Sequence, residues 1–139
     1  MDKALNYLAL SRKAGLIELG EEPVGAAARL GKAYLIVVAG DASDHTWRRA
    51  RSFAAGTEQQ CLRASFTKDE MGMAVGRTSL AIAAFTDAAM ALAFVTALGQ
   101  PEKHKAVLEV LTNKKEHLQK RKAEAKAHQR NLRKGKGKK

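Results

Sequence analysis

The chain has few of the residues that build disulfides, metal sites and membrane spans. Among its 139 residues there is one cysteine, Cys61, and the four histidines are widely spaced. A single cysteine excludes an internal disulfide and fits a reducing compartment, and zinc sites need clustered cysteine or histidine ligands. No apolar run has the length of a membrane span or of a signal peptide with a cleavage site. We therefore expect a cytoplasmic protein with no metal, no other cofactor and no membrane partner.

Sequence motifs of common enzyme sites are also absent, including the nucleophile elbow, the phosphate-binding loop and the dinucleotide-binding glycines. Cys61 lies in a predicted strand, where an inert buried thiol is more common than a nucleophile. One polar cluster follows a predicted strand, namely Asp41, Ser43, Asp44 and His45. Open α/β sheets often bind ligands at such a position, but short Asp and Ser side chains more often begin the next helix. We therefore expect a protein that is not an enzyme.

Positive charge is abundant, and it is concentrated at one end of the chain. The net charge is +11, from 25 Lys and Arg against 14 Asp and Glu. Residues 1–100 carry 11 basic and 10 acidic side chains, whereas residues 101–139 carry 14 and 4. Such a block attracts polyanions by releasing their counterions, so nucleic acid is the first partner to consider. An anionic membrane surface is less favoured, because the block lacks the Trp, Phe and Leu face of an interfacial helix.

Helices and strands are predicted to alternate along the chain. Helices are expected where a capping residue precedes an apolar pattern and a glycine follows it, over residues 2–15, 23–31, 43–55, 67–76 and 86–98. Strands are expected for the β-rich runs at residues 16–19, 33–39, 60–65 and 79–85. Two of these strands, 33–39 and 79–85, are apolar on both faces, which is typical of a sheet covered by helices on both sides. The pattern predicts the α/β class, as a three-layer α/β/α sandwich.

The starts of individual helices rest on local signals. Pro23 suits the first position of the second helix, where its missing N–H is not needed. The cap of the third helix is either Ser43 or Asp44, and that of the last helix is either Thr86 or Asp87. The segment that begins at residue 67 matches a capping box.

Residues 1–99 are expected to form the domain, and residues 100–139 a basic C-terminal extension. The extension is helix-prone by composition, but beyond Leu118 no apolar position repeats at helical spacing. Its apolar residues up to that point are Val107, Leu108, Val110, Leu111 and Leu118. We therefore expect a tail that is solvated or disordered unless a partner orders it, and whose removal from residue 101 onward leaves a folded domain.

Several large side chains are expected to pack rather than to bind a partner. Trp47 shares a helical face with Phe53, so packing is favoured over stacking on a base. Three methionines are interpreted as core filler, namely Met71, Met73 and Met90. Three arginines are interpreted as a solvated helix face that is also able to touch phosphate, namely Arg48, Arg49 and Arg51.

Four segments resemble a known family in their order and spacing. They are KALNYLALSRKAG, LIELGEEPVGAAARLGKAYLIVVAGDAS, EMGMAVGR and LAIAAFTD. Together they are similar to the ribosomal protein L-seven-Ae and L-thirty-e family, and especially to its bacterial branch of small RNA-binding proteins. The resemblance covers about residues 3–98 and leaves the tail out. It implies an α/β/α sandwich that binds structured RNA, typically a kink-turn, through the start of the second helix and the loop before the last strand.

The resemblance implies an RNA-binding surface made of Gly20, Glu21, Glu22, Pro23, Ala26, Lys32, Arg77, Thr78 and Ser79. A helix N-terminus offers unpaired N–H groups and a positive dipole to phosphate, and nearby side chains can reach the bases of a bent RNA. Three of these positions depart from the family. Typical kink-turn binders have Asn or Lys at position 22, Glu or Gln at position 23, and Lys at position 26. Two hydrogen-bonding side chains and one cation are therefore replaced, which predicts weak kink-turn binding.

The function that we expect is RNA binding by a monomer, with the ribosome as a candidate partner. The domain would recognise structured, kink-turn-like RNA, and the basic tail would add phosphate contacts. The alternative is a protein-protein interaction module of the same fold, in which the acidic loop at residues 21–23 meets a basic partner without specific RNA recognition. A role as half of an RNA ribose methyltransferase is disfavoured, because the chain has no room for the cofactor-binding domain.

Overall fold

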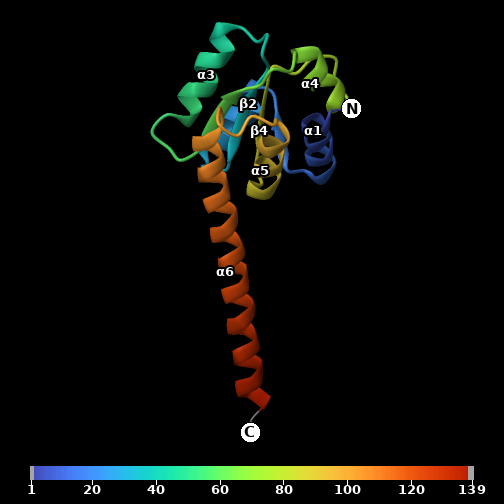
Figure 1. Ribbon diagram of the computed structural model, residues 1–139. Coiled ribbons are helices and arrows are strands. Elements are labelled where there is room, and N and C mark those ends of the chain that lie inside the picture. The colour runs from blue at the N-terminus through green and yellow to red at the C-terminus, as the bar shows by residue number, and fades with distance from the viewer. Residues whose placement is uncertain (1, 138–139) are drawn as a thin grey trace.

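The computed structural model describes residues 2–137, with side chains described up to residue 130. It consists of a four-stranded sheet with helices on both faces and a long C-terminal helix that extends from this body (Figure 1). The helices are α1 (Lys3–Ala14), α2 (Glu21–Arg29), α3 (Asp44–Ala54), α4 (Lys68–Ala74), α5 (Ala88–Ala97) and α6 (Lys105–Gly137). The strands are β1 (Ile17–Leu19), β2 (Leu35–Val38), β3 (Gln60–Arg63) and β4 (Ile82–Phe85).

The strand order in the sheet is β1-β4-β2-β3. β4 runs antiparallel to both β1 and β2, and β2 runs parallel to β3. The two central strands, β2 and β4, are buried at every residue, as their two-sided apolar pattern predicted. β4 is shorter than predicted, because the N–H of Leu80 donates to the carbonyl of Lys68 in α4, 3.0 Å away, and not to the sheet.

The helices divide into two layers. α2 and α3 contact each other and one face of the sheet, whereas α1, α4 and α5 lie on the other face (Figure 1). The core between the sheet and α5 contains Phe85 and Phe94, whose ring centroids are 5.1 Å apart. The three-layer α/β/α sandwich predicted from the sequence is confirmed.

The first two helices begin at or near the predicted residues. Asp2 caps α1 by accepting a hydrogen bond from a backbone N–H 2.7 Å away, and Gly15 ends the helix with a φ of +70°. α2 begins earlier than predicted, because Gly20 is its N-cap and Pro23 occupies the third helical position. Proline is tolerated there, since the first hydrogen bond within the helix is donated by the next residue, to the carbonyl of Gly20 at 3.0 Å.

The structure decides between the two possible caps at each of the later helices. Ser43, and not Asp44, caps α3, because its hydroxyl accepts from a backbone N–H at 3.2 Å. Asp87, and not Thr86, caps α5, because its carboxylate accepts from a backbone N–H at 2.9 Å. Thr67 begins α4 with both hydrogen bonds of the predicted capping box.

The side chains expected in the core are there, with one exception. Trp47 and Phe53 pack against the core, and Met71 is fully buried. Met73 is 77% exposed, so its interpretation as core filler is wrong. Two residues along an α-helix are separated by about 200°, so Met73 lies on the opposite side of α4 from Met71.

The C-terminal helix α6 is partly integrated into the body and partly an exposed arm. Its first turns contact α5 and β3, and Leu111 is fully buried as part of the core. From residue 119 to residue 130 every side chain is exposed. The helix-prone character of the tail is therefore confirmed. Removal of the chain from residue 101 onward would uncover the core, so a tail that can be removed without harm begins only after Leu118.

Candidate nucleic-acid interface

The start of α2 and the loop at residues 77–79 lie next to each other, although they are far apart in the sequence. The N–H of Gly20 donates to the carbonyl of Ile82 at 3.0 Å, which connects the start of α2 to β4. A Cβ atom placed on Gly20 would lie 3.9 Å from the Nη1 atom of Arg77. The two segments that the family resemblance assigned to RNA binding thus form one surface.

The N-terminus of α2 offers free backbone donors. Gly20 has a φ of +96° and no side chain with which to cap the helix. Within the described part of the chain, the N–H groups of Glu21 and Glu22 have no hydrogen-bond partner, and Pro23 has no N–H. Free N–H groups at the positive end of a helix dipole are suited to binding a phosphate.

Acidic side chains next to these donors oppose the binding of an anion. The carboxylate of Glu21 pairs with the Nε atom of Arg49 in α3 at 2.7 Å, which offsets part of its charge. Glu22 is exposed, and the described residues include no ion-pair partner for it. The net field at the start of α2 is therefore less positive than the backbone alone would make it.

A pocket of about 640 Å³ continues this surface between α2 and α3. Its lining includes Glu21, Glu22, Gly25, Ala26, Arg29, Arg49 and Phe53. The guanidinium carbon of Arg49 lies 5.0 Å from the centre of the Phe53 ring, a geometry that holds the cation beside the pocket. Sequence reasoning placed Arg49 on a solvated face and did not single out Arg29. No local pattern connects Arg49 to α2, because its position depends on the packing of α3 against Gly25. Arg29 belongs to α2 itself, one turn after Gly25.

Lys32 is the predicted site residue that the structure does not bring to this surface. It follows the C-terminal end of α2, and this nine-residue helix is about 14 Å long at 1.5 Å per residue. Pro23 and Ala26 are exposed beside the N-terminus, as are Arg77, Thr78 and Ser79 in the loop.

The loop at residues 77–79 is fixed by its contacts with α4. The N–H of Arg77 donates to the carbonyl of Gly72 at 2.8 Å. A Cβ atom on Gly72 would lie 2.7 Å from the backbone nitrogen of Ser79 and 2.9 Å from the carbonyl oxygen of Arg77. Glycine at position 72 therefore allows the loop to lie directly against the helix.

The substitution Gly72→Ala is expected to displace this loop and to lower the free energy of unfolding by about 2 kcal/mol, the usual size of an overpacking effect. Urea denaturation measures the stability, and amide chemical shifts of Arg77 and Ser79 report on the loop. The control is Gly76→Ala, where a Cβ would meet open space and only the φ of +77° is strained, at a cost of about 1 kcal/mol. Unchanged shifts at Ser79 in the Gly72 variant would contradict the close approach.

The other chemically suggestive residues have structural roles. Asp41 accepts a hydrogen bond from the N–H of Lys68 at 2.7 Å, which connects the loop after β2 to the start of α4. Burial raises the pKa of the Cys61 thiol to about 11, so this thiol is protonated at neutral pH and is a poor nucleophile. Within residues 2–137 no three potential metal ligands cluster, and no helix is both long and apolar enough to cross a membrane.

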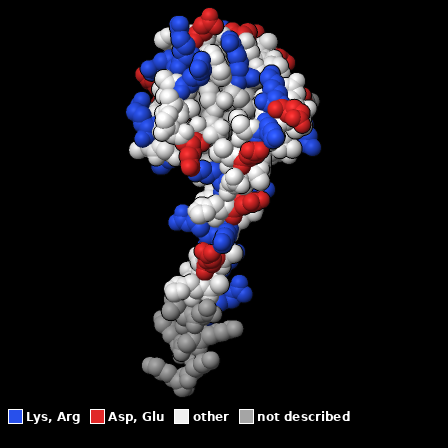
Figure 2. Space-filling view, turned by 60° about the vertical axis from the view of Figure 1, so that its left-hand side comes forward, with Lys and Arg blue, Asp and Glu red and all other residues white. Residues whose placement is uncertain are grey.

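Basic side chains extend from the body onto α6. Figure 2 shows Lys and Arg around an uncharged area on one face of the domain and again along the helix, with Asp and Glu among them. The exposed arm contributes five of these cations before residue 131, namely Lys120, Arg121, Lys122, Lys126 and Arg130. Only one acidic residue, Glu124, lies among them. The arm is therefore the most strongly positive part of the surface that the structure describes.

Comparison with known proteins shows similarity at the level of structure. No protein-family model and no curated protein sequence matches the chain. A protein of unknown function from Bacillus halodurans has 21% sequence identity and a TM-score of 0.66, over 71% of this chain and 99% of its own. A 15.5-kDa RNA-binding protein from Giardia lamblia has 17% identity and a TM-score of 0.59, over 73% of this chain and 86% of its own. The chain thus has the L-seven-Ae-like α/β/α fold that its sequence resemblance implied.

Proposed function

We propose that this protein binds structured RNA through the start of α2 and the loop at residues 77–79, with α6 as an electrostatic arm. The observation that carries the proposal is the proximity of Arg77 to the uncapped N-terminus of α2. Free backbone donors and a guanidinium at one place are suited to a phosphate group. The similarity in fold to an RNA-binding protein supports RNA as the ligand class.

The proposed target is a kink-turn-like element, and the proposed partner is the ribosome. A sharply bent RNA places phosphates and exposed base edges close together, so one compact protein surface can contact both. α6 has 33 residues and is about 50 Å long at 1.5 Å per residue, which is enough to follow several phosphates of a large RNA. The protein then acts by binding, in the cytoplasm, without a catalytic step.

Three side chains limit the proposed affinity for a kink-turn. Glu22, Pro23 and Ala26 are all exposed beside the N-terminus of α2, at positions where the resembled family has polar or basic residues. Glu22 places an uncompensated negative charge near the phosphate site. Pro23 and Ala26 have no side-chain group that can form a hydrogen bond with RNA.

The triple substitution Glu22→Asn, Pro23→Glu and Ala26→Lys is therefore expected to raise the affinity for a kink-turn RNA at least about tenfold, the equivalent of about 1.4 kcal/mol. Folding should be preserved, because all three positions are exposed and Glu is favourable in the first turn of a helix. Fluorescence anisotropy with the full chain measures the binding of both proteins.

The control is the same RNA without its sheared G·A pairs, which has the same charge and reports the unspecific attraction of α6. The triple variant should gain affinity for the kink-turn and not for this control. Equal binding of the natural and variant proteins to both RNAs would contradict a recognition surface at α2, and would direct attention to Arg48, Arg49 and Arg51. Partners that remain bound after nuclease treatment would instead support the protein-protein interaction module.

A further inference from the structure

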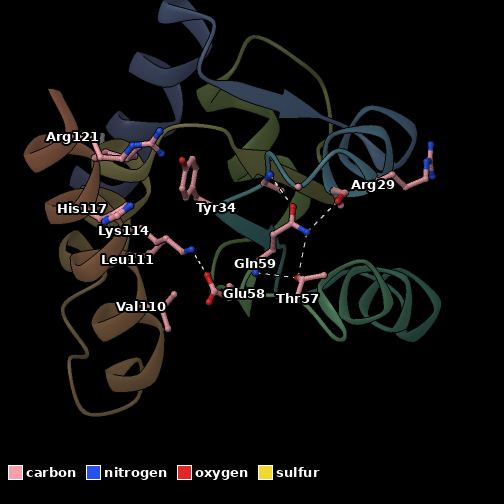
Figure 3. Close-up of a pocket in the computed structure, with 14 residues that line it drawn as sticks. Arg29, Tyr34, Thr57, Glu58, Gln59, Val110, Leu111, Lys114, His117 and Arg121 are labelled. Carbon is pink, nitrogen blue, oxygen red and sulfur yellow. Dashed lines mark hydrogen bonds and ion pairs between the residues drawn. The ribbon is translucent and has the colours of Figure 1, made fainter. Parts of the chain in front are cut away.

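A separate pocket lies at the other end of α2, between α6 and the loop at residues 57–59. Its volume is about 540 Å³, which lies within the range of roughly 300–1,000 Å³ typical of ligand sites. One wall comes from a single face of α6, which contributes Val110, Leu111, Lys114, His117, Leu118 and Arg121. Figure 3 shows Tyr34 between these side chains and the loop.

The opposite wall is fixed by hydrogen bonds. The Oε1 atom of Gln59 accepts from the N–H of Ala33 at 2.9 Å, and its Nε2 atom donates to the carbonyl of Ala28 at 3.1 Å. These bonds connect the loop to the end of α2 and to the start of β2. Glu58 in the same loop pairs with Lys114 of α6, so the two walls are connected to each other (Figure 3). The pocket is therefore formed before any ligand arrives.

Positive charge predominates around the pocket. Three basic residues of α6 line it, namely Lys114, His117 and Arg121, against one acidic residue, Glu58. Arg29 also borders the pocket, but its guanidinium points away from it, toward Gly25 (Figure 3). Lys114 is paired with that acid, whereas Arg121 forms no ion pair with any residue that the structure describes. A site with an unpaired guanidinium group over a partly apolar floor favours an anion that also has an apolar part.

An aromatic ring lies in the same pocket. The backbone of Tyr34 is fixed at the sheet, because its N–H donates to Phe85 at 2.9 Å and its carbonyl accepts from Gln60 at 3.2 Å. Its half-buried ring lines the cavity together with the apolar side chain of Leu111. A tyrosine with a fixed backbone that lines the same pocket as a cation is the combination that binds a nucleobase by stacking and its phosphate by charge.

We propose that this pocket binds one nucleotide, with the base on Tyr34 and the phosphate on Arg121 and His117. The nucleotide is either a free mononucleotide or an unpaired nucleotide of an RNA. In the second case the inference rests on the proposed function, in which α6 contacts the RNA. Arg121 lies both in the pocket and at the base of the exposed arm. An RNA strand that follows the arm toward the domain would then reach the pocket.

The test uses the full chain and a uridine pentanucleotide that contains one 5-iodouridine, which crosslinks to stacked aromatic side chains under ultraviolet light. Mass spectrometry should map the crosslink to Tyr34 or His117. The variant Arg121→Gln should bind the pentanucleotide about tenfold more weakly than the natural protein, as expected for the loss of a charged hydrogen bond.

The matched control is Arg130→Gln, which removes the same charge from the same helix at an exposed position outside the pocket. It should weaken binding about twofold or less, as for one screened surface charge. Tyr34→Phe retains the ring and should bind as the natural protein does, whereas Tyr34→Leu should lose about fivefold or more. The proposed nucleotide pocket would be overturned if Arg121→Gln and Arg130→Gln weakened binding equally. Crosslinks confined to residues other than Tyr34 and His117 would also overturn it.

Uridine monophosphate distinguishes the two sources of the ligand. Shifts of the Tyr34 and His117 resonances with the mononucleotide alone identify a free nucleotide, and shifts that require the pentanucleotide identify RNA. Discrimination between kink-turn and mutant RNA is measured on the same proteins. If the protein discriminates between the two RNAs but does not bind the pentanucleotide, the proposed nucleotide pocket is overturned and the proposed function is not. If the protein does not discriminate between the two RNAs but Arg121→Gln still weakens pentanucleotide binding, the proposed function is overturned and the proposed pocket is not.

Discussion

Removal of residues 119–139 is expected to lower the affinity for RNA at least about a hundredfold at roughly 0.1 M salt, and to flatten its salt dependence. The removed segment has ten basic residues and one acidic residue. If about six of these cations neutralise phosphates, the logarithm of the affinity falls with the logarithm of salt at a slope of about −4 to −5. Anisotropy titrations over a range of salt concentrations measure both quantities. An unchanged slope would show that the arm is not the source of electrostatic affinity.

The position of the cut decides whether this experiment can be interpreted. A chain that ends at Leu118 retains all of α6 that packs on the body, and circular dichroism should show a folded domain. A full-length variant with Lys120, Lys122 and Lys126 replaced by Gln separates charge from length. It should lose about a third of the salt slope, because three of the ten cations in this segment are gone.

The substitution Leu111→Ala is expected to lower the free energy of unfolding by about 3 kcal/mol, as for other fully buried leucines. Leu111 is 0% exposed and belongs to the same core as the central strands, so its truncation leaves a cavity where α6 packs on the body. Urea denaturation followed by circular dichroism measures the change.

The same substitution at Leu118 is the matched control for Leu111. Leu118 lies two turns further along α6 and is only partly buried, so Leu118→Ala should cost about 1 kcal/mol or less. Similar losses at both positions would contradict the packing of α6 against the core. A large loss at Leu111 alone would confirm that α6 packs on the core through Leu111.

Helix starts were predictable to within a few residues because capping is a local interaction. Asp2 and Thr67 each bind backbone N–H groups no more than three residues away, so the sequence pattern contains both partners. For the same reason the cap choice at Ser43 was open, and the predicted start of α2 at Pro23 was two residues late. Neighbouring Ser43 and Asp44 are similar caps, and a proline fits several positions of the first turn. The alternative helix starts therefore differ little in local free energy.

The exposure of Met73 was beyond such local patterns, whereas the position of Lys32 follows from the predicted helix at residues 23–31. α4 is short, and only the surface on which it packs decides which of its faces is covered. Lys32 is close to the α2 residues in the sequence, but the helix itself separates it from the N-terminal surface. Sequence proximity is a poor guide to spatial proximity wherever a helix intervenes.

The sequence by itself determined the order of helices and strands, the two buried central strands and the concentration of charge in the tail. These follow from short-range hydrogen bonds, from the periodicity of apolar residues and from composition. Only the tertiary structure decided that Arg77 lies beside Gly20, that Arg49 pairs with Glu21, and that Leu111 is buried in the core. Each of these contacts joins segments far apart in the chain, and its free energy depends on how whole helices pack on the sheet, which no local pattern specifies.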